Sequence, residues 1–540
     1  MAVFPAARAD AASAIAQRVM ALALALMLAA CASLPSGVQR PVSHAITDVA
    51  ATSLATVVQA SLPAEAADRS AFRLLPDGDQ ALDARFALAR RAEKTLDVQY
   101  YLIARDATGL QFLRELRDAA ARGVRVRVLV DDLYATGADA LLAGLAAQPN
   151  VEVRLFNPLP MRGGSFASRI VLSLHEFPRI NRRMHNKLFI ADNSFAVTGG
   201  RNVADEYFGR SEPANFIDMD ILAAGPLVGE LSAVFDRYWN SEHSYPVQAL
   251  AGGDVEAADA RRVFDARVRD VPVAEAPRAF DSLGQRDLSS QLANGQVQLM
   301  AAAARVLADA PGKIDAPQGA PADAPTVHSH TLDLIGTAQA EVLMASPYFV
   351  PGARNMAVMR EAVARDVRVS VVTNSLATTD EPLAHFGYSR HRGDLLEMGV
   401  ALYELMPTAE HKAAETTLDY HGSLGRLHAK LAVIDERWLY IGSMNMDRRS
   451  ARWNTEIGLV VDSRAIARQV AGLLRRERLP DSYRLRLAED TGRIEWVAQE
   501  GDEQVVHARV QVVHAREPAA TFGRSLRLWM ASRFVGEEML

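Results

Sequence analysis

Cysteine is almost absent from this sequence, whose 540 residues include a single one, Cys31. A lone thiol cannot form an intrachain disulfide, so no disulfide framework holds the fold together. The chain can instead bury a large apolar core, because 49% of its residues are hydrophobic. With 23% charged residues and no dominant low-complexity composition, the sequence is typical of a globular protein of about three or four structural units.

An excess of positive charge is also lacking. The formal net charge is −6 and the isoelectric point is about 6.1. No global positive field therefore favours a polyanionic nucleic acid backbone. We expect no nucleic-acid partner, and the composition disfavours a nuclease.

Apolar runs of membrane-spanning length are missing as well. The N-terminal apolar run covers residues 19–30, follows Arg8 and Arg18, and is too short to span a bilayer, so it predicts a secretory signal. Its end, LAAC at 28–31, resembles a bacterial lipobox, in which the cysteine becomes the lipidated first residue. The alternative is an ordinary signal peptide followed by a chance cysteine.

These features predict where the protein resides. We expect residues 1–30 to be a signal peptide and residues 31–75, which show no clear periodicity, to be a lipidated N-terminus and tether. The mature chain would be exported and anchored by Cys31 to the periplasmic face of a bacterial membrane, for which we expect the outer membrane. It would lie on that membrane and not cross it.

Strand-like and helix-like patterns alternate in the same order in two parts of the chain. The first part predicts strands at 96–101, 124–132 and 151–156 and helices at 110–121 and 138–147. The second predicts strands at 341–349, 367–375 and 400–405 and helices near 355–365 and 381–398. This order indicates an internal duplication in which each copy is a sheet covered by helices.

The duplication sets the expected domain boundaries. The predicted units are a first half at 76–250, a linker and connecting segment at 251–326, a second half at 327–480 and a C-terminal extension at 481–540. Four prolines among Ala, Asp and Gly favour the linker assignment.

Each copy ends in a motif of identical spacing. The first reads MHNKLFIADNSFAVTGGRN and the second LHAKLAVIDERWLYIGSMN. The shared positions are His185, Lys187, Asp192 and Asn202 in the first motif, and His428, Lys430, Asp435 and Asn445 in the second. Residues two apart on a strand share a face, so each His and Lys should point toward one site.

Lysine scarcity supports the importance of these positions. Arginine and lysine together number 59, and lysine occurs only at Lys94, Lys187, Lys313, Lys412 and Lys430. Two of the five occupy matching motif positions, where a compact ammonium and the asparagine amides suit a phosphate group. A buried structural histidine would explain one motif alone, but not a matched pair. We expect no metal, because each histidine stands beside a lysine that would repel a cation.

Both motifs match the HxK(x4)D(x6)G[GS]xN signature, and the sequence therefore resembles the phospholipase D superfamily over roughly residues 80–480. The stretches LDVQYY, VRVRVLVDD, VEVRLFNP and GGRNVADEYFG are similar to bacterial cardiolipin synthases of the C type. The resemblance implies an α/β fold of two similar phospholipase D-like α/β/α sandwich halves, related by pseudo-twofold symmetry, with one active site between them. It implies no cofactor.

The resemblance also implies residue roles. His185 would form a phosphohistidine and His428 would carry protons, although the order could be reversed. Lys187, Lys430, Asn202 and Asn445 would bind the phosphoryl oxygens. Asp218 and Glu456 would each hydrogen-bond a histidine, with Asp220 as an alternative to Asp218, and Asp192 and Asp435 would support the motifs.

Two questions about the substrate stay open in the sequence. Residues 161–183, before the first motif, carry several apolar side chains that form either a lipid-facing rim or a buried packing segment. The expected reaction is phosphatidyl transfer between membrane phospholipids that yields cardiolipin from phosphatidylglycerol. The alternatives are hydrolysis to phosphatidic acid, an exported nuclease and a non-catalytic lipid-binding lipoprotein. The oligomeric state is not predicted.

Overall fold

The computed structural model describes residues 33–62, 69–250, 256–316, 325–407, 424–500 and 510–520. The predicted signal peptide, Cys31 and everything after residue 520 lie outside these ranges. Among the described residues, no helix is both long enough and apolar enough to cross a membrane.

The first sheet is built around three parallel strands that the alternating pattern predicts. Its strands are β1 (Ser70–Leu75), β2 (Thr95–Tyr100), β3 (Arg125–Asp131), β4 (Val151–Phe156), β5 (Leu188–Ala191), β6 (Phe195–Gly199), β8 (Asp220–Ala224) and β9 (Ser244–Pro246). They lie in the order β9-β4-β3-β2-β5-β6-β8-β1, with β4, β3 and β2 parallel and the other pairs antiparallel.

The second sheet repeats this plan. Its strands are β11 (Glu341–Ala345), β12 (Arg368–Asn374), β13 (Ala401–Leu405), β15 (Leu431–Ile434), β16 (Trp438–Gly442), β17 (Ile457–Asp462), β18 (Ser482–Leu487), β19 (Ile494–Glu500) and β20 (Val510–His514). Parallel strands β13, β12 and β11 are followed by antiparallel β15, β16 and β17. This order matches β4-β3-β2-β5-β6-β8, so the predicted duplication and the α/β class are confirmed.

Strand β10 (Met300–Ala308) joins the two sheets. Its first residues pair with β1 and its later residues with β17, both antiparallel. The described residues thereby form one continuous sheet of 18 strands. A pair of short strands, β7 (Ala214–Ile217) and β14 (Leu424–Leu427), makes a second link between the halves.

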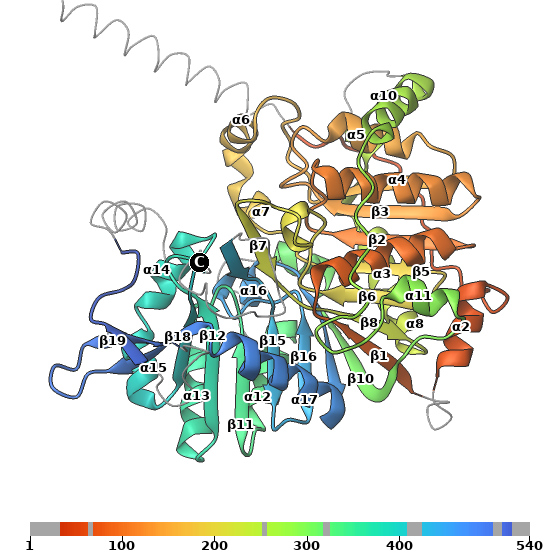
Figure 1. Cartoon of the computed structure of the whole chain (residues 1–540). Coiled ribbons are helices and arrows are strands. Elements are labelled where there is room, and N and C mark those ends of the chain that lie inside the picture. Colours follow the sequence, from red (N-terminus) through yellow and green to blue (C-terminus); the bar gives the residue numbers. More distant parts are fainter. Residues whose placement is uncertain are drawn as a thin grey trace, which may run out of the picture.

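Helices cover both faces of each sheet (Figure 1). The α-helices of the first half are α2 (Ser53–Ser61), α3 (Gly78–Arg91), α4 (Ala107–Ala121), α5 (Asp139–Ala146), α6 (Phe166–Leu172), α7 (Phe177–Ile180), α8 (Leu227–Trp239), α9 (Val247–Leu250), α10 (Ala257–Arg269) and α11 (Leu288–Ala293). In the second half they are α12 (Val327–Gly336), α13 (Ala353–Ala364), α14 (Pro382–Ser389), α15 (Arg392–Met398), α16 (Arg448–Arg452) and α17 (Arg464–Leu473).

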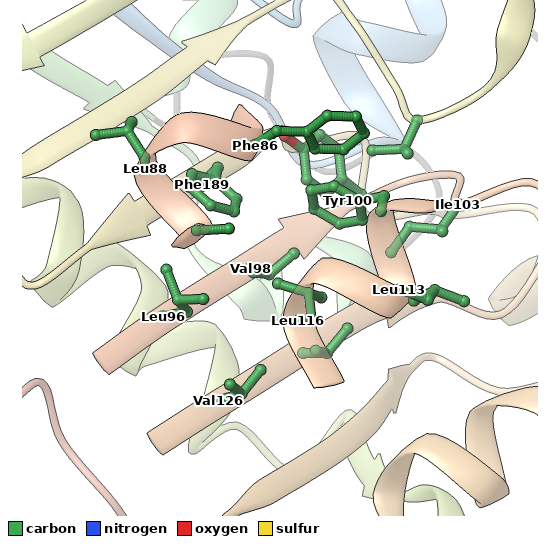
Figure 2. Packing of buried hydrophobic residues seen from close by; sticks show 14 of the residues in the cluster. Phe86, Leu88, Leu96, Val98, Tyr100, Ile103, Leu113, Leu116, Val126 and Phe189 are labelled. Atoms are coloured by element: carbon green, nitrogen blue, oxygen red, sulfur yellow. The ribbon is translucent and has the colours of Figure 1, made fainter. Parts of the chain in front are cut away.

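Three apolar cores hold these layers together. One lies under α3, α4 and α5, a second under α12, α13 and α15, and the third unites α8 and α17 with the inner faces of both sheets. In the first core, Leu113 and Leu116 of α4 pack with Leu96 and Val98 of β2 (Figure 2). Burying each such leucine or valine contributes about 1.5–3 kcal/mol. The third core belongs to both halves and fixes how they face each other.

The three segments expected outside the two halves contain helices and strands of the fold. The segment predicted as a tether contains α2 and the buried strand β1, which pairs with β8 and β10. The segment predicted as a linker contains α10, α11 and the joining strand β10. The segment predicted as an extension supplies β18, which continues the second sheet from β13. Periodicity missed these elements because their partners lie far away in the sequence.

The motif aspartates bind the backbone that leads into two strands. Asp192 accepts backbone N–H groups of Glu93, Lys94 and Thr95, with its shortest bonds at 2.8–2.9 Å. Asp435 accepts the equivalent N–H groups of 339, 340 and 341 at 2.8–3.0 Å. Each carboxylate therefore closes the turn that leads into β2 or β11.

These two aspartates form a matched pair for a stability test. We predict that Asp192→Ala lowers the free energy of unfolding by about 3 kcal/mol and Asp435→Ala by about 1 kcal/mol. The reason is that Asp192 is fully buried and Asp435 is half-buried, so water can replace the lost carboxylate more easily at Asp435. Urea denaturation measures both values, and equal losses would contradict this account.

Candidate active site

His185 is positioned by the other half of the protein. It lies three residues before β5, and its backbone N–H donates to the carbonyl of Thr455 at 2.9 Å. Met184, its neighbour, forms an isolated parallel bridge with the same threonine. The backbone of the first motif is therefore attached directly to the second half.

His428 is positioned in the reciprocal way. It follows β14, which runs parallel to β7 of the first half, and its N–H donates to the carbonyl of Ile217 at 2.8 Å. Both histidines are buried, with 8% of His185 and 4% of His428 exposed. Each motif histidine thus sits on the boundary between the two halves.

The side chains of the two histidines also contact the opposite half. Nδ1 of His185 lies 3.0 Å from Oε2 of Glu456, and Nδ1 of His428 lies 2.6 Å from Oδ2 of Asp218. Each histidine therefore meets a carboxylate from the opposite half. A carboxylate on Nδ1 fixes the ring orientation and leaves Nε2 for chemistry.

The strand register identifies Asp218, not Asp220, as the partner of His428. Gly199 of β6 is paired with Asp220, and the equivalent Gly442 of β16 with Gly458. Counting back two residues from each partner gives Asp218 and Glu456, which are structural equivalents. Asp220 instead accepts a 2.9 Å hydrogen bond from Arg85.

The residue after the first glycine of each motif, Gly200 or Ser443, fits the carboxylate beside it. A Cβ on Gly200 would lie 2.0 Å from Oδ1 of Asp218, so this position must lack a side chain. The equivalent Ser443 donates its hydroxyl to Oε2 of Glu456 and accepts the N–H of Ile457 at 3.0 Å. Whether this position of the signature holds Gly or Ser therefore depends on its contact with the carboxylate that binds the histidine.

Each motif lysine has N–H donors that the described residues do not use. Lys187 Nζ donates to the carbonyl of His185 at 2.8 Å, and Lys430 Nζ makes the equivalent bond to His428. An ammonium has three N–H donors. Since each lysine makes this one hydrogen bond within the described residues, two donors of each remain for a substrate.

The motif asparagines are also incompletely satisfied. Asn202 donates through Nδ2 to the hydroxyl of Tyr207 at 2.9 Å, while its Oδ1 is buried without a partner in the described residues. The Oδ1 atom of Asn445 is buried and unpartnered in the same sense. Buried polar atoms without partners are costly, so a ligand that offered a hydrogen-bond donor to these oxygens would gain affinity.

Burial and neighbouring charge lower the basicity of both histidines. Burial, opposed by Glu456 and assisted by Lys187 and Lys430, lowers the pKa of His185 to about 4. Burial and Lys430, opposed by Asp218, lower the pKa of His428 to about 4. The rings are therefore neutral at physiological pH in the ligand-free protein, and a neutral ring nitrogen can act as a nucleophile or base.

The charged groups around the histidines are coupled across the halves. Burial lowers the pKa of Lys430 to about 8 against the attraction of Asp218, and lowers that of Lys187 well below its usual value. Burial would raise the pKa of Asp218, but His428 and Lys430 outweigh it and bring this pKa to about 2. His185 and Lys187 likewise outweigh burial and lower the pKa of Glu456.

Aromatic residues that the motif pattern did not single out complete the site. Tyr101 meets the His185 ring at 5.0 Å between centroids, and Tyr207 and Phe216 meet His428 at 5.1 and 4.8 Å. Tyr101 ends the LDVQYY stretch and Tyr207 lies in GGRNVADEYFG, and both stretches are among those that carry the family resemblance. Their roles depend on tertiary contacts that no spacing reveals.

The described residues contain one group that could hold a metal ion, Glu242, His243 and Asp315. It includes none of the motif residues. In the motif site, the lysine beside each histidine opposes a cation, so a mechanism without metal remains our prediction.

The lowered histidine pKa values make a prediction about pH. Between pH 6.5 and pH 4 the unfolded chain binds protons at these histidines that the folded protein does not, so stability should fall as the pH drops through this window. Each histidine contributes up to about 1.4 kcal/mol per pH unit. NMR of ¹³C-labelled histidine should show both rings neutral at pH 6. Titration of either ring near pH 6.5 would contradict the burial argument.

Comparison with known proteins is consistent with this geometry. The family model described as "Cardiolipin synthase, PLD-like domain" matches residues 86–239 and 331–477, one segment in each half. Cardiolipin synthase C of Escherichia coli (strain K12) is 36% identical over 454 residues, which cover 84% of this chain and 92% of the relative. Cardiolipin synthase A of Pseudomonas fluorescens is 27% identical over 74% of this chain and 67% of the relative.

A solved structure shares the fold. The crystal structure of phosphatidylserine synthase from Haemophilus influenzae Rd KW20 aligns with a TM-score of 0.52 and 15% sequence identity, covering 80% of this chain and 92% of that chain. The two family segments each carry one complete motif, and the duplicated sheets bring the motifs to a shared boundary. The chain therefore belongs to the cardiolipin synthase, phospholipase D-like domain family of enzymes.

Proposed function

We propose that this protein is a phosphatidyltransferase that forms cardiolipin from phosphatidylglycerol and a second phospholipid through a phosphohistidine intermediate. One observation carries the proposal: two motif histidines, each held by a carboxylate of the other half, accompany two lysines whose remaining N–H donors have no partner in the described residues. The names of its cardiolipin synthase relatives support the choice of lipid substrates.

The unused donors define the substrate's charged group. Lys187 and Lys430 would bind the non-bridging oxygens of a phosphodiester, and the Nδ2 amide groups of Asn202 and Asn445 would complete the polar shell as donors. Fixed cations stabilise the extra negative charge of a five-coordinate phosphorus more strongly in a buried site than in water.

In the first step, Nε2 of His185 attacks phosphorus of the donor phospholipid. The bond from phosphorus to the headgroup oxygen breaks, and His428 gives that oxygen a proton, so the headgroup leaves as an alcohol. The phosphatidyl group remains on His185 as a phosphoramidate. Glu456, on Nδ1 of His185, stabilises the positive charge that the ring acquires.

In the second step, the terminal hydroxyl of phosphatidylglycerol attacks the same phosphorus. His428 removes the hydroxyl proton while the bond between phosphorus and His185 breaks, which regenerates both rings. The product carries two phosphatidyl groups on one glycerol. Water in place of the lipid alcohol would give phosphatidic acid.

Substrate binding would also adjust the proton carrier. Lys430 lowers the pKa of His428 in the ligand-free site. A bound phosphodiester anion offsets that charge, and Asp218 already favours the protonated ring. His428 therefore becomes a better proton carrier when substrate is present.

The acidic surroundings of His428 disfavour a nucleic acid substrate. Asp380 lies close enough to oppose the lowering of the His428 pKa, and its charge also raises the pKa of Glu206 and Glu381 after burial. Clustered carboxylates repel a polyphosphate backbone, whereas a phospholipid brings a single diester to the lysines.

The proposed location is the periplasmic face of the outer membrane, with a lipid on Cys31. The apolar run and the LAAC sequence at 28–31 support it. Both lie outside the described residues. An anchored enzyme meets its phospholipid substrates by diffusion within a surface.

The proposed chemistry separates the two histidines. His185→Ala and His428→Ala should each lose nearly all turnover of mixed phosphatidylglycerol and phosphatidylethanolamine, measured as cardiolipin by mass spectrometry. With a donor whose leaving group needs no proton, His428→Ala should accumulate a covalent phosphatidyl-enzyme and His185→Ala should not. Intact-protein mass spectrometry detects the adduct.

Other results would change specific parts of the proposal. An adduct in His185→Ala alone would reverse the two roles. Phosphatidic acid as the sole product of the wild type would replace transfer by hydrolysis. Loss of activity with a chelator and its return with zinc would contradict the mechanism without metal.

The anchor has its own test. Cells fed a radiolabelled fatty acid should label the wild-type protein, and Cys31→Ser should abolish the label because no other cysteine is present. Label that persists in Cys31→Ser would refute lipidation at this residue.

A further inference from the structure

The segment before the first motif contains a helix with its charged residue inside and its apolar residues outside. Arg169 of α6 is 1% exposed, whereas Phe166 and Val171 of the same helix are each 44% exposed. Leu174 and Phe177 continue this surface at 46% and 40%. An ordinary surface helix has the opposite arrangement.

The exposed apolar side chains are concentrated here. The described residues include ten large apolar or aromatic side chains that are strongly exposed, and five of them are Tyr134, Phe166, Val171, Leu174 and Phe177. Four of those five fall within twelve consecutive residues. Such concentration indicates a surface that has a partner, because scattered exposed apolar residues need none.

The buried arginine holds this surface in place. Arg169 donates to Oδ2 of Asp132, just after β3, at 3.1 Å, and Arg162 donates to the same oxygen at 2.6 Å. Arg169 also donates to the carbonyl of Met161 at 3.1 Å. Charge-assisted hydrogen bonds to the sheet therefore fix α6 with its apolar residues turned outward.

An aromatic path connects this surface with the site. The rings of Phe166 and Tyr134 are stacked at 6.0 Å with an interplanar angle of 3°, Tyr134 meets Tyr101 at 5.4 Å, and Tyr101 meets His185 at 5.0 Å. The path runs without interruption from an exposed ring to the proposed nucleophile.

We propose that the surface formed by Phe166, Val171, Leu174 and Phe177 inserts into the phospholipid bilayer, and that Tyr134 and Phe166 line the route by which the acyl-bearing part of a substrate reaches His185. The inference rests on the proposed function and deepens it. A phospholipid presents an acyl region and a phosphate together. The apolar path ends at the lysine and histidine side chains that suit that phosphate.

The position of this surface favours a bilayer over another apolar partner. The rings of Phe166, Tyr134 and Tyr101 lead from the surface to His185. The lysine beside His185 has N–H donors that suit a phosphate. A phospholipid in a bilayer brings hydrocarbon to one end of this path and a phosphate to the other, which an apolar protein segment does not.

A local probe can test insertion independently of any lipid anchor. In a Cys31→Ser background, Val171→Cys and the matched Val263→Cys, whose native valine on α10 is 46% exposed, would carry an environment-sensitive nitrobenzoxadiazole label. With vesicles of phosphatidylglycerol and phosphatidylethanolamine, we expect the label at 171 to shift to shorter wavelength and to be quenched by doxyl-labelled lipid. The label at 263 should not change.

Activity adds a second readout. Val171→Asp should lower turnover of vesicle substrate by about tenfold or more, since it places a charge where hydrocarbon is expected. Turnover of a dihexanoyl phospholipid below its critical micelle concentration should stay within about twofold, which also shows that the variant folds. Val263→Asp should leave both activities unchanged.

The outcomes separate this surface from the chemistry. An unshifted label at 171, or equal vesicle turnover by Val171→Asp and the wild type, would overturn the membrane-inserting surface even if cardiolipin is made. Insertion of the label at 171 without turnover of either substrate by the wild type would support the surface and contradict the proposed function.

Discussion

The exchange of carboxylates between the halves is the interaction on which the site depends. Glu456 of the second half holds His185, and Asp218 of the first half holds His428. Neither half alone can orient its own histidine or offset the charge that the ring would acquire in the proposed reaction. The shared core around α8 and α17 and the joining strand β10 therefore serve chemistry as well as stability, because a small shift between the halves would break both pairs.

Charge balance explains why so many ionisable groups can be buried together. Two lysines and two carboxylates offset one another, and the histidines are neutral because burial lowers each pKa to about 4. Removing one partner from such a cluster costs about 3–5 kcal/mol, because it leaves an uncompensated buried charge. The phosphodiester anion of the proposed substrate would favour protonation of His428, whose ring Asp218 already contacts.

The sequence predicts local features of this fold well and long-range partners poorly. Identical spacing locates both motifs, and the strand and helix pattern predicts β2, β3 and β4 and their equivalents β11, β12 and β13, because those depend on nearby residues. It does not predict β10 as the joining strand, and it favours Asp218 but keeps Asp220 as an alternative. Those outcomes depend on sheet register, which pairs residues far apart in the chain. The helix expected at 381–398 is two helices, α14 and α15.

The two halves reach the same contact with different residues. A short acid, Asp218, is combined with Gly200, whose Cβ would clash with it, and a longer acid, Glu456, is combined with Ser443, whose hydroxyl donates to it. Ser450 donates to the other oxygen of Glu456 at 2.8 Å. The carboxylate that meets His185 is therefore held by two hydroxyls, whereas the one that meets His428 has a glycine at the position of Ser443. The two halves therefore give their histidines two distinct environments, which suits the proposed reaction with one nucleophile and one proton carrier.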